Sequence, residues 1–168
     1  MLRVVTNTTP LIALAQCDLF PVLQTLFGQV LIPPAVYREV VSEGDGRAGA
    51  EETQGAVTDG WLVIQELQEP ADASHLQQAF LLGDGESEAL ALARQQPTDV
   101  ILLDEARAVR CAREIGLSVL RTVGLLLQAK AQGHLGSVQP ALDQLRMAGF
   151  RLSESVYQAA LRHASESH

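Results

Sequence analysis

The sequence predicts an α/β protein in which helices cover a parallel sheet. Short apolar runs alternate with longer stretches of helical periodicity along the 168 residues, a pattern typical of parallel strands joined by crossover helices. Hydrophobic residues make up 47% of the chain and aromatic residues only 4%, so Leu, Val, Ile and Ala must fill the core, as they do where helices pack on a sheet. The length favours a single domain, residues 1–168.

Five strands are expected, and Val, Ile and Leu form almost all of their interiors, as in a sheet that is buried on both faces. They are residues 2–6, 29–32, 61–65, 100–103 and 118–121.

Several of the expected helices carry start or stop signals. Thr9 is a suitable N-cap with Pro10 at the first helical position, and Pro33-Pro34 begins a second helix in the same way. Asp104 is expected to begin a helix that ends at Gly116. Two further helices, "ADASHLQQAFLL" and "GESEALALARQQ", are separated by a glycine-rich turn.

Three helical stretches follow the last strand: "TVGLLLQAKAQG", "SVQPALDQLRMAG" and "SESVYQAALRHASE". The C-terminal helices, about residues 137–166, are expected to pack on the domain or to extend it. Residues 42–55 are rich in Gly and Glu and are expected to form a mobile loop that leads into a short helix.

Charge and cysteine content restrict the possible functions. Twenty acidic and twelve basic residues give a formal charge of −8, so a broad electropositive surface for duplex nucleic acid is not expected, and any nucleic acid would be held locally. Cys17 and Cys111, the only cysteines, indicate a reducing compartment, and no apolar run reaches membrane-spanning length. We expect a cytoplasmic protein.

Three common site types find no support. The Gly44-x-Gly46-x-x-Gly49 pattern follows a helix, whereas a dinucleotide fingerprint follows a strand. The four histidines lie outside any zinc motif, and no serine stands in a GxSxG turn.

Two polar positions interrupt the chain where predicted strands end: Asn7 after the first strand and Asp104 after the fourth. Ligands of open parallel sheets collect at such strand ends. Each residue also has a simpler interpretation, since Asn7 suits a turn and Asp104 suits a helix N-cap. Glu86 falls in the first turn of a helix, where a carboxylate is favoured anyway, and Glu39 suits the solvent-facing side of an otherwise apolar helix.

If these four residues converge on one cleft, their oxygen atoms suit Mg²⁺ or Mn²⁺, and the site would hydrolyse a phosphodiester by activating water. Arg107 and Arg110, one helical turn apart, are candidates to contact substrate phosphate or to pair with nearby acids.

Five motifs together resemble the PIN-like group of predicted nucleic-acid-binding proteins, which is related to the ribonuclease toxins of toxin–antitoxin operons. They are "VVTNTTPLIALA", "VLIPPAVYREVV", "LLGDGESEALALA", "VILLDEARAVRCAREIGL" and "VLRTVGLLLQAKAQG". The likeness spans residues 2 to about 135, and the order and spacing of the motifs make it specific.

The resemblance implies a three-layer α/β/α fold whose sheet has the strand order 3-2-1-4-5, which places the ends of the first and fourth strands side by side. It also implies a Mg²⁺- or Mn²⁺-dependent endoribonuclease acting on single-stranded RNA. Asn7, Glu39, Glu86 and Asp104 would form the catalytic set, with the metal held by Asn7, Glu86 and Asp104. Supporting residues would be Thr9, Glu88 and Glu105.

Typical members of the group have aspartate where this chain has Asn7, and an amide carries no charge and cannot act as a base. An alternative function is therefore a catalytically degenerate module that binds nucleic acid or a partner. Family likeness suggests a small antitoxin protein as that partner, and a homodimer. A phosphoacceptor domain is a third interpretation, based on the aspartate in "ILLDE", although such domains have an acidic pair after the first strand, where this chain has Thr6-Asn7.

Overall fold

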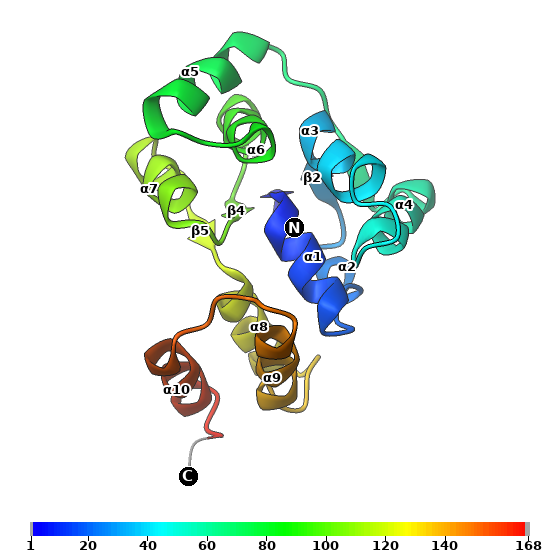
Figure 1. Ribbon diagram of the computed structural model, residues 1–168, viewed down its shortest axis with the longest axis vertical. Helices are drawn as coiled ribbons and strands as arrows, with labels where there is room; N and C mark the ends of the chain where they lie inside the picture. The colour runs from blue at the N-terminus through cyan, green and yellow to red at the C-terminus, as the bar shows by residue number, and fades with distance from the viewer. Residues whose placement is uncertain (1, 167–168) are drawn as a thin grey trace.

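A computed structural model describes residues 2–166 and contains a five-stranded parallel sheet flanked by helices (Figure 1). The strands are β1 (Val4–Thr6), β2 (Val30–Ile32), β3 (Leu62–Ile64), β4 (Val100–Leu102) and β5 (Val119–Leu120). Their order is β3-β2-β1-β4-β5, and every neighbouring pair is parallel. The predicted α/β class, the strand positions and the strand order are confirmed.

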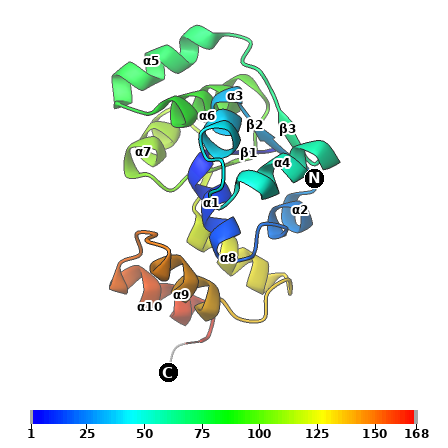
Figure 2. The same ribbon diagram turned by 45° about the vertical axis from the view of Figure 1, so that its right-hand side comes forward.

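The helices before β4 are α1 (Thr8–Gln16), α2 (Val22–Phe27), α3 (Pro34–Tyr37), the π-helical turn η1 (Arg38–Ser42), α4 (Ala50–Asp59), α5 (Pro70–Phe80) and α6 (Asp84–Gln95). Those after it are α7 (Ala106–Glu114), α8 (Thr122–Ala131), α9 (Gln139–Met147) and α10 (Glu154–His163). In Figures 1 and 2, α5 lies at one end of the molecule, and α9 and α10 lie together at the other.

The centre of the sheet is the most deeply buried part of the fold. Val5 in β1 and Ile101 in β4 are fully buried, and the two residues are in register. Helix α6 packs against both strands, α4 against β3 and α7 against β5. Buried aliphatic side chains from β1 and β4 thus fix the relative position of the two strand ends that follow them.

Several predicted boundaries require correction. Helix α1 begins at Thr8, with Asn7 rather than Thr9 at the N-cap position. Helix α7 begins at Ala106, two residues after Asp104, although Gly116 does follow it with a φ of 84° as expected for a helix stop. Within the predicted loop 42–55, α4 already begins at Ala50.

No helix within residues 2–166 has the length and apolar character needed to cross a membrane.

Candidate functional site

Asn7 immediately follows β1 and is almost completely buried, with 1% of its surface exposed. Its backbone N–H donates to the Leu102 carbonyl at 3.1 Å, which continues the pairing of β1 with β4. Asn7 stands at the N-cap position of α1, but its side chain makes no capping bond to the helix. Its Nδ2 instead donates to Glu105 Oε2 at 3.3 Å.

Glu105 is the acid that faces Asn7. Its Oε1 accepts a short hydrogen bond from the Thr9 hydroxyl in the first turn of α1. Its Oε2 accepts the bond from the Asn7 amide. The carboxylate therefore links the end of β4 to the end of β1, two segments that lie side by side because the strands pair directly.

Asp104 faces the opposite way. Its Oδ1 accepts from the Thr122 backbone N–H at 3.0 Å and its Oδ2 from the Thr122 hydroxyl at 2.7 Å, so the carboxylate caps α8. The sequence had suggested that Asp104 caps the helix directly after it, which is wrong. Burial raises the pKa of Asp104 above its ordinary value, although the two bonds from Thr122 act in the opposite direction.

Glu39 lies in η1 and is half-buried rather than on a solvent-facing stripe. Its Oε2 accepts from the Thr8 hydroxyl at 2.6 Å, and its Oε1 accepts from the Gly85 backbone N–H at 2.9 Å. These two bonds hold the carboxylate between the first turns of α1 and α6.

Glu86 lies in the first turn of α6, where its Oε1 accepts from the Gly83 N–H at 3.1 Å. Burial raises the pKa of the Glu86 carboxyl, and the Gly83 N–H opposes this change. The negative charges of Glu105 and Glu39 raise that pKa further. The structure therefore brings Glu105 and Glu39 within electrostatic reach of Glu86; these three acids together with Asn7 are called the acidic cluster below.

The remaining predicted residues surround this cluster or turn away from it. Glu88 Oε1 accepts from the Ala35 N–H at 3.1 Å and so caps α3. The exposed Arg107 lowers the pKa of Glu86 by its charge, and its guanidinium lies 3.5 Å from the Leu81 carbonyl oxygen. Arg110 is exposed on α7. Arg38, which precedes Glu39, forms an ion pair of 3.6 Å with Asp84, which precedes Gly85.

The donor atoms of the acidic cluster suit a divalent cation. Asn7 Oδ1 is buried and has no hydrogen-bond partner among the described residues, and such an orphaned oxygen costs about 1–3 kcal/mol unless an ion or water satisfies it. Mg²⁺ and Mn²⁺ prefer oxygen ligands, use few protein carboxylates and keep several waters. Within residues 2–166, however, no three acidic, His or Cys side chains lie close enough to ligate one ion as they stand. The residues thus fit an ion that is held by few direct protein ligands.

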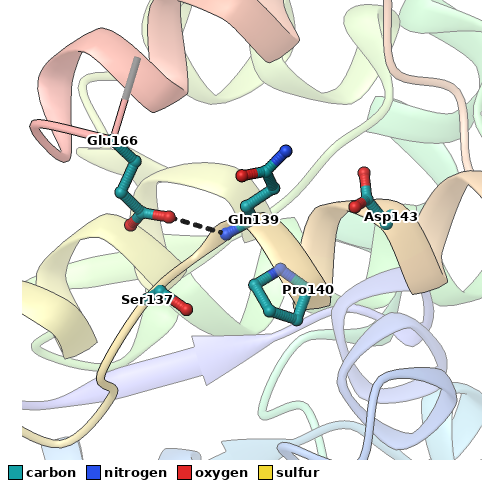
Figure 3. Close-up of a pocket in the computed structure, with 5 residues that line it drawn as sticks. All are labelled: Ser137, Gln139, Pro140, Asp143 and Glu166. Atoms are coloured by element: carbon teal, nitrogen blue, oxygen red, sulfur yellow. Dashed lines mark hydrogen bonds between the residues drawn. The ribbon is translucent and has the colours of Figure 1, made fainter. Parts of the chain in front are cut away.

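A hollow of about 420 Å³ lies elsewhere, at the start of α9 (Figure 3). Among the described residues that line it, the acids are Asp143 and Glu166. Glu166 already accepts bonds from the Lys130 ammonium at 2.7 Å and from the Val138 and Gln139 N–H groups, and Asp143 accepts from Tyr157. These internal bonds make the hollow a poorer ligand site than the acidic cluster.

Sequence reasoning missed three residues that organise the site: Thr8, Gly85 and Thr122. Each holds an acid that lies 18 to 46 positions away in the chain. The consecutive acids Asp104 and Glu105 were the only hint in the sequence that two carboxylates at the end of β4 have different roles, one bound to Thr122 and the other to Asn7.

A family model described as a PIN domain, DUF3368, matches residues 3–166, which is nearly the whole chain. No curated protein matches the chain.

Proposed function

The chain belongs to the PIN-domain family, and we propose that it is a Mg²⁺- or Mn²⁺-dependent endoribonuclease that cleaves single-stranded RNA. PIN domains have a nuclease-type fold and generally use divalent metals. The observation that carries the proposal is the acidic cluster itself. In it, a buried Asn7 oxygen without a hydrogen-bond partner among the described residues lies beside Glu105, and the charges of Glu105 and Glu39 raise the pKa of Glu86.

Asn7 Oδ1, Glu86 and Glu105 are the proposed ligands. The sequence had placed Asp104 in this set, but both of its oxygens accept bonds from Thr122, so we assign it the role of fixing the end of β4. Glu39 remains in the catalytic set beside Glu86. A bound Mg²⁺ or Mn²⁺ would polarise the scissile phosphate and activate water for attack.

The protein groups have separate tasks in this mechanism. Glu86 keeps Oε1 on the Gly83 N–H, which leaves Oε2 for the ion or for a proton. Burial and the two neighbouring carboxylates raise the pKa of Glu86, so its carboxyl retains a proton more readily than an exposed glutamate does. Thr9 holds Glu105, and Thr8 holds Glu39, through their hydroxyl groups.

The charge distribution supports single-stranded RNA as substrate. A net charge of −8 opposes the close approach of a duplex, whose phosphates are densely spaced. Arg107 and Arg110 are exposed on one side of α7 and supply local positive charge for a single strand.

A catalytically degenerate module that binds nucleic acid or a partner is the second candidate, and Asn7 is the observation that favours it. The amide brings one negative charge fewer to the cluster than an aspartate would. For either function we propose a cytoplasmic homodimer that pairs with a small antitoxin protein, the enzyme acting as the toxin. The two buried free cysteines agree with a reducing compartment.

The deciding experiment is calorimetric titration with Mn²⁺ combined with a cleavage assay on a mixed pool of single-stranded RNA. Wild-type protein should bind Mn²⁺ and cleave RNA, and excess EDTA should stop cleavage. Glu86→Gln and Glu105→Gln should each weaken Mn²⁺ binding at least about tenfold, because each change removes one negatively charged oxygen ligand from the ion. The exposed Glu51→Gln is the matched control and should behave as wild type.

Cleavage that persists in EDTA and in Glu86→Gln would refute the metal-dependent mechanism. Mn²⁺ binding without cleavage would favour the degenerate module. Expression of the enzyme without its antitoxin should arrest growth, whereas Glu86→Gln should not.

A further inference from the structure

Gly85, the second residue of α6, lies directly against the Glu39 carboxylate. A Cβ atom added at Gly85 would lie 2.3 Å from Glu39 Oε2 and 2.8 Å from its Cδ, well inside van der Waals contact. The backbone of Gly85 is not in the left-handed region, so an alanine could adopt the same helical conformation. What requires a glycine here is the space that Glu39 occupies.

The same residue also binds the carboxylate. Its N–H donates to Glu39 Oε1 at 2.9 Å, one of the free N–H groups in the first turn of α6. On the other side, the Thr8 hydroxyl donates to Oε2 at 2.6 Å. The positive end of the α6 dipole adds to these bonds and offsets the repulsion from Glu86, the next residue in the helix.

The π-helical turn η1 directs Glu39 toward this position. The Glu43 N–H donates to the Arg38 carbonyl at 2.8 Å, five residues back, and such turns within helices occur frequently at functional sites. Gly44 follows the turn so closely that a Cβ there would lie 2.3 Å from the Val40 carbonyl oxygen. Two glycines thus allow close contacts on either side of Glu39.

We propose that Gly85 is a positioning residue that holds the Glu39 carboxylate against the first turn of α6, so that Glu39 and Glu86 act together in the acidic cluster. The role in metal binding and cleavage rests on the proposed function. The effect on the fold does not, because the clash and the hydrogen bond exist without any ion.

Gly85→Ala tests the proposal, with Gly55→Ala as the matched control. Gly55 lies in α4, and a Cβ there would meet nothing within 4 Å. In EDTA, Gly85→Ala should lower the urea midpoint of unfolding, whereas Gly55→Ala should leave it equal or raise it. In Mn²⁺, Gly85→Ala should weaken ion affinity several-fold and lower kcat more than it raises KM for RNA.

A second background separates positioning from helix packing. In Glu39→Ala protein, which has no carboxylate to collide with, the added Gly85→Ala change should no longer lower the urea midpoint. In Glu39→Gln protein, which keeps the shape of the side chain, it should still do so. Equal midpoint losses in the wild-type and Glu39→Ala backgrounds would overturn the proposal, because the cost would then come from other contacts of α6.

An unchanged midpoint and unchanged Mn²⁺ affinity in Gly85→Ala would also overturn it, since the carboxylate would then move aside freely. If wild-type protein binds no Mn²⁺, the proposed function fails, and the urea comparison still decides whether Gly85 positions Glu39.

Discussion

The Asn7 amide donates a hydrogen bond of 3.3 Å to the Glu105 carboxylate, across 98 residues of chain. An aspartate at position 7 would instead face Glu105 with a second negative charge. In a site made only of acids, a bound cation satisfies the carboxylates. Here the Asn7 amide satisfies Glu105 in part without any ion, because it donates a hydrogen bond to that carboxylate. We therefore expect the acidic cluster to be stable without metal.

Asn7→Asp should reverse that property. Loss of the donor and addition of a like charge should lower the free energy of unfolding in EDTA by about 1–3 kcal/mol. Mn²⁺ should then bind more tightly than in wild type and restore the loss by mass action on the folded state. Melting curves with EDTA and with Mn²⁺ measure both effects.

The exposed Gln29→Glu is the control for Asn7→Asp, because it adds the same charge away from the cluster. A metal-dependent melting shift in Asn7→Asp that equals the wild-type shift would remove Asn7 from the proposed ligand set.

Asp104 should contribute to stability through Thr122, with or without metal. Asp104→Ala leaves the Thr122 N–H without its acceptor and should cost about 1–3 kcal/mol in EDTA. Thr122→Val should cost about 1 kcal/mol through the lost hydroxyl bond. The two changes together should cost less than their sum, because they remove a shared contact.

Urea unfolding of the single and double variants measures this coupling, and the exposed Asp45→Ala serves as control. Additive losses, or an Asp104→Ala loss no larger than that of Asp45→Ala, would contradict the capping role.

Glu86 should make the metal-free protein less stable as the pH rises. Burial and the neighbouring charges of Glu105 and Glu39 raise its pKa above 4.5, so the folded state binds a proton more tightly than the unfolded state does. The contribution of Glu86 to the free energy of unfolding is fully present below pH 4.5 and is lost as the pH rises through its folded-state pKa. Glu86→Gln keeps an acceptor for Gly83, and its free energy of unfolding in EDTA should fall less between pH 4.5 and 7.

Urea titrations across this pH range give the two curves. Part of the slope should remain in Glu86→Gln, because burial also raises the pKa of Asp104. Parallel curves for the two proteins would show that Glu86 ionises in the folded state as it does in the unfolded chain.

Glu166 should show the opposite pH dependence. Burial tends to raise its pKa, but the Lys130 ammonium and the Val138 and Gln139 N–H groups together lower it below 4.5. The stabilisation is therefore present above pH 4.5 and is lost as the pH falls through the lowered value. Glu166→Gln should cost about 0.5–2 kcal/mol near pH 7, as removal of a helix cap does.

Wild type and Glu166→Gln should converge in stability as the pH falls below the folded-state pKa of Glu166, as measured by urea unfolding with Glu51→Gln as control. A constant difference at every pH would mean that the carboxylate charge contributes nothing.

The strands were predictable because apolar runs report burial directly. Each predicted strand overlaps the observed one, although the observed strands are shorter, as for 2–6 and Val4–Thr6. Strand order came from the family likeness, since periodicity does not reveal which strands are neighbours. Polar composition misplaced the start of α4, because an exposed helix can be as polar as a loop.

The site was harder to predict because it depends on the direction in which each side chain points as well as on its position in the sequence. Successive side chains on extended chain point to opposite sides, so the consecutive acids Asp104 and Glu105 reach different partners. Sequence alone identifies the pair but not which member faces Asn7. The contact of Glu39 with Gly85 joins residues 46 positions apart and leaves no local pattern to read.

The placement of β1 at the centre of the sheet affects when the site can form during synthesis. Asn7 leaves the ribosome early, but Glu105 follows 98 residues later. At about 5–20 residues per second this is a delay of roughly 5–20 s. Until β4 has emerged, β1 has a partner on one edge only, and the acidic cluster lacks Glu105. Under the proposed function, the nascent chain would therefore be unable to cut RNA until β4 and Glu105 have left the ribosome.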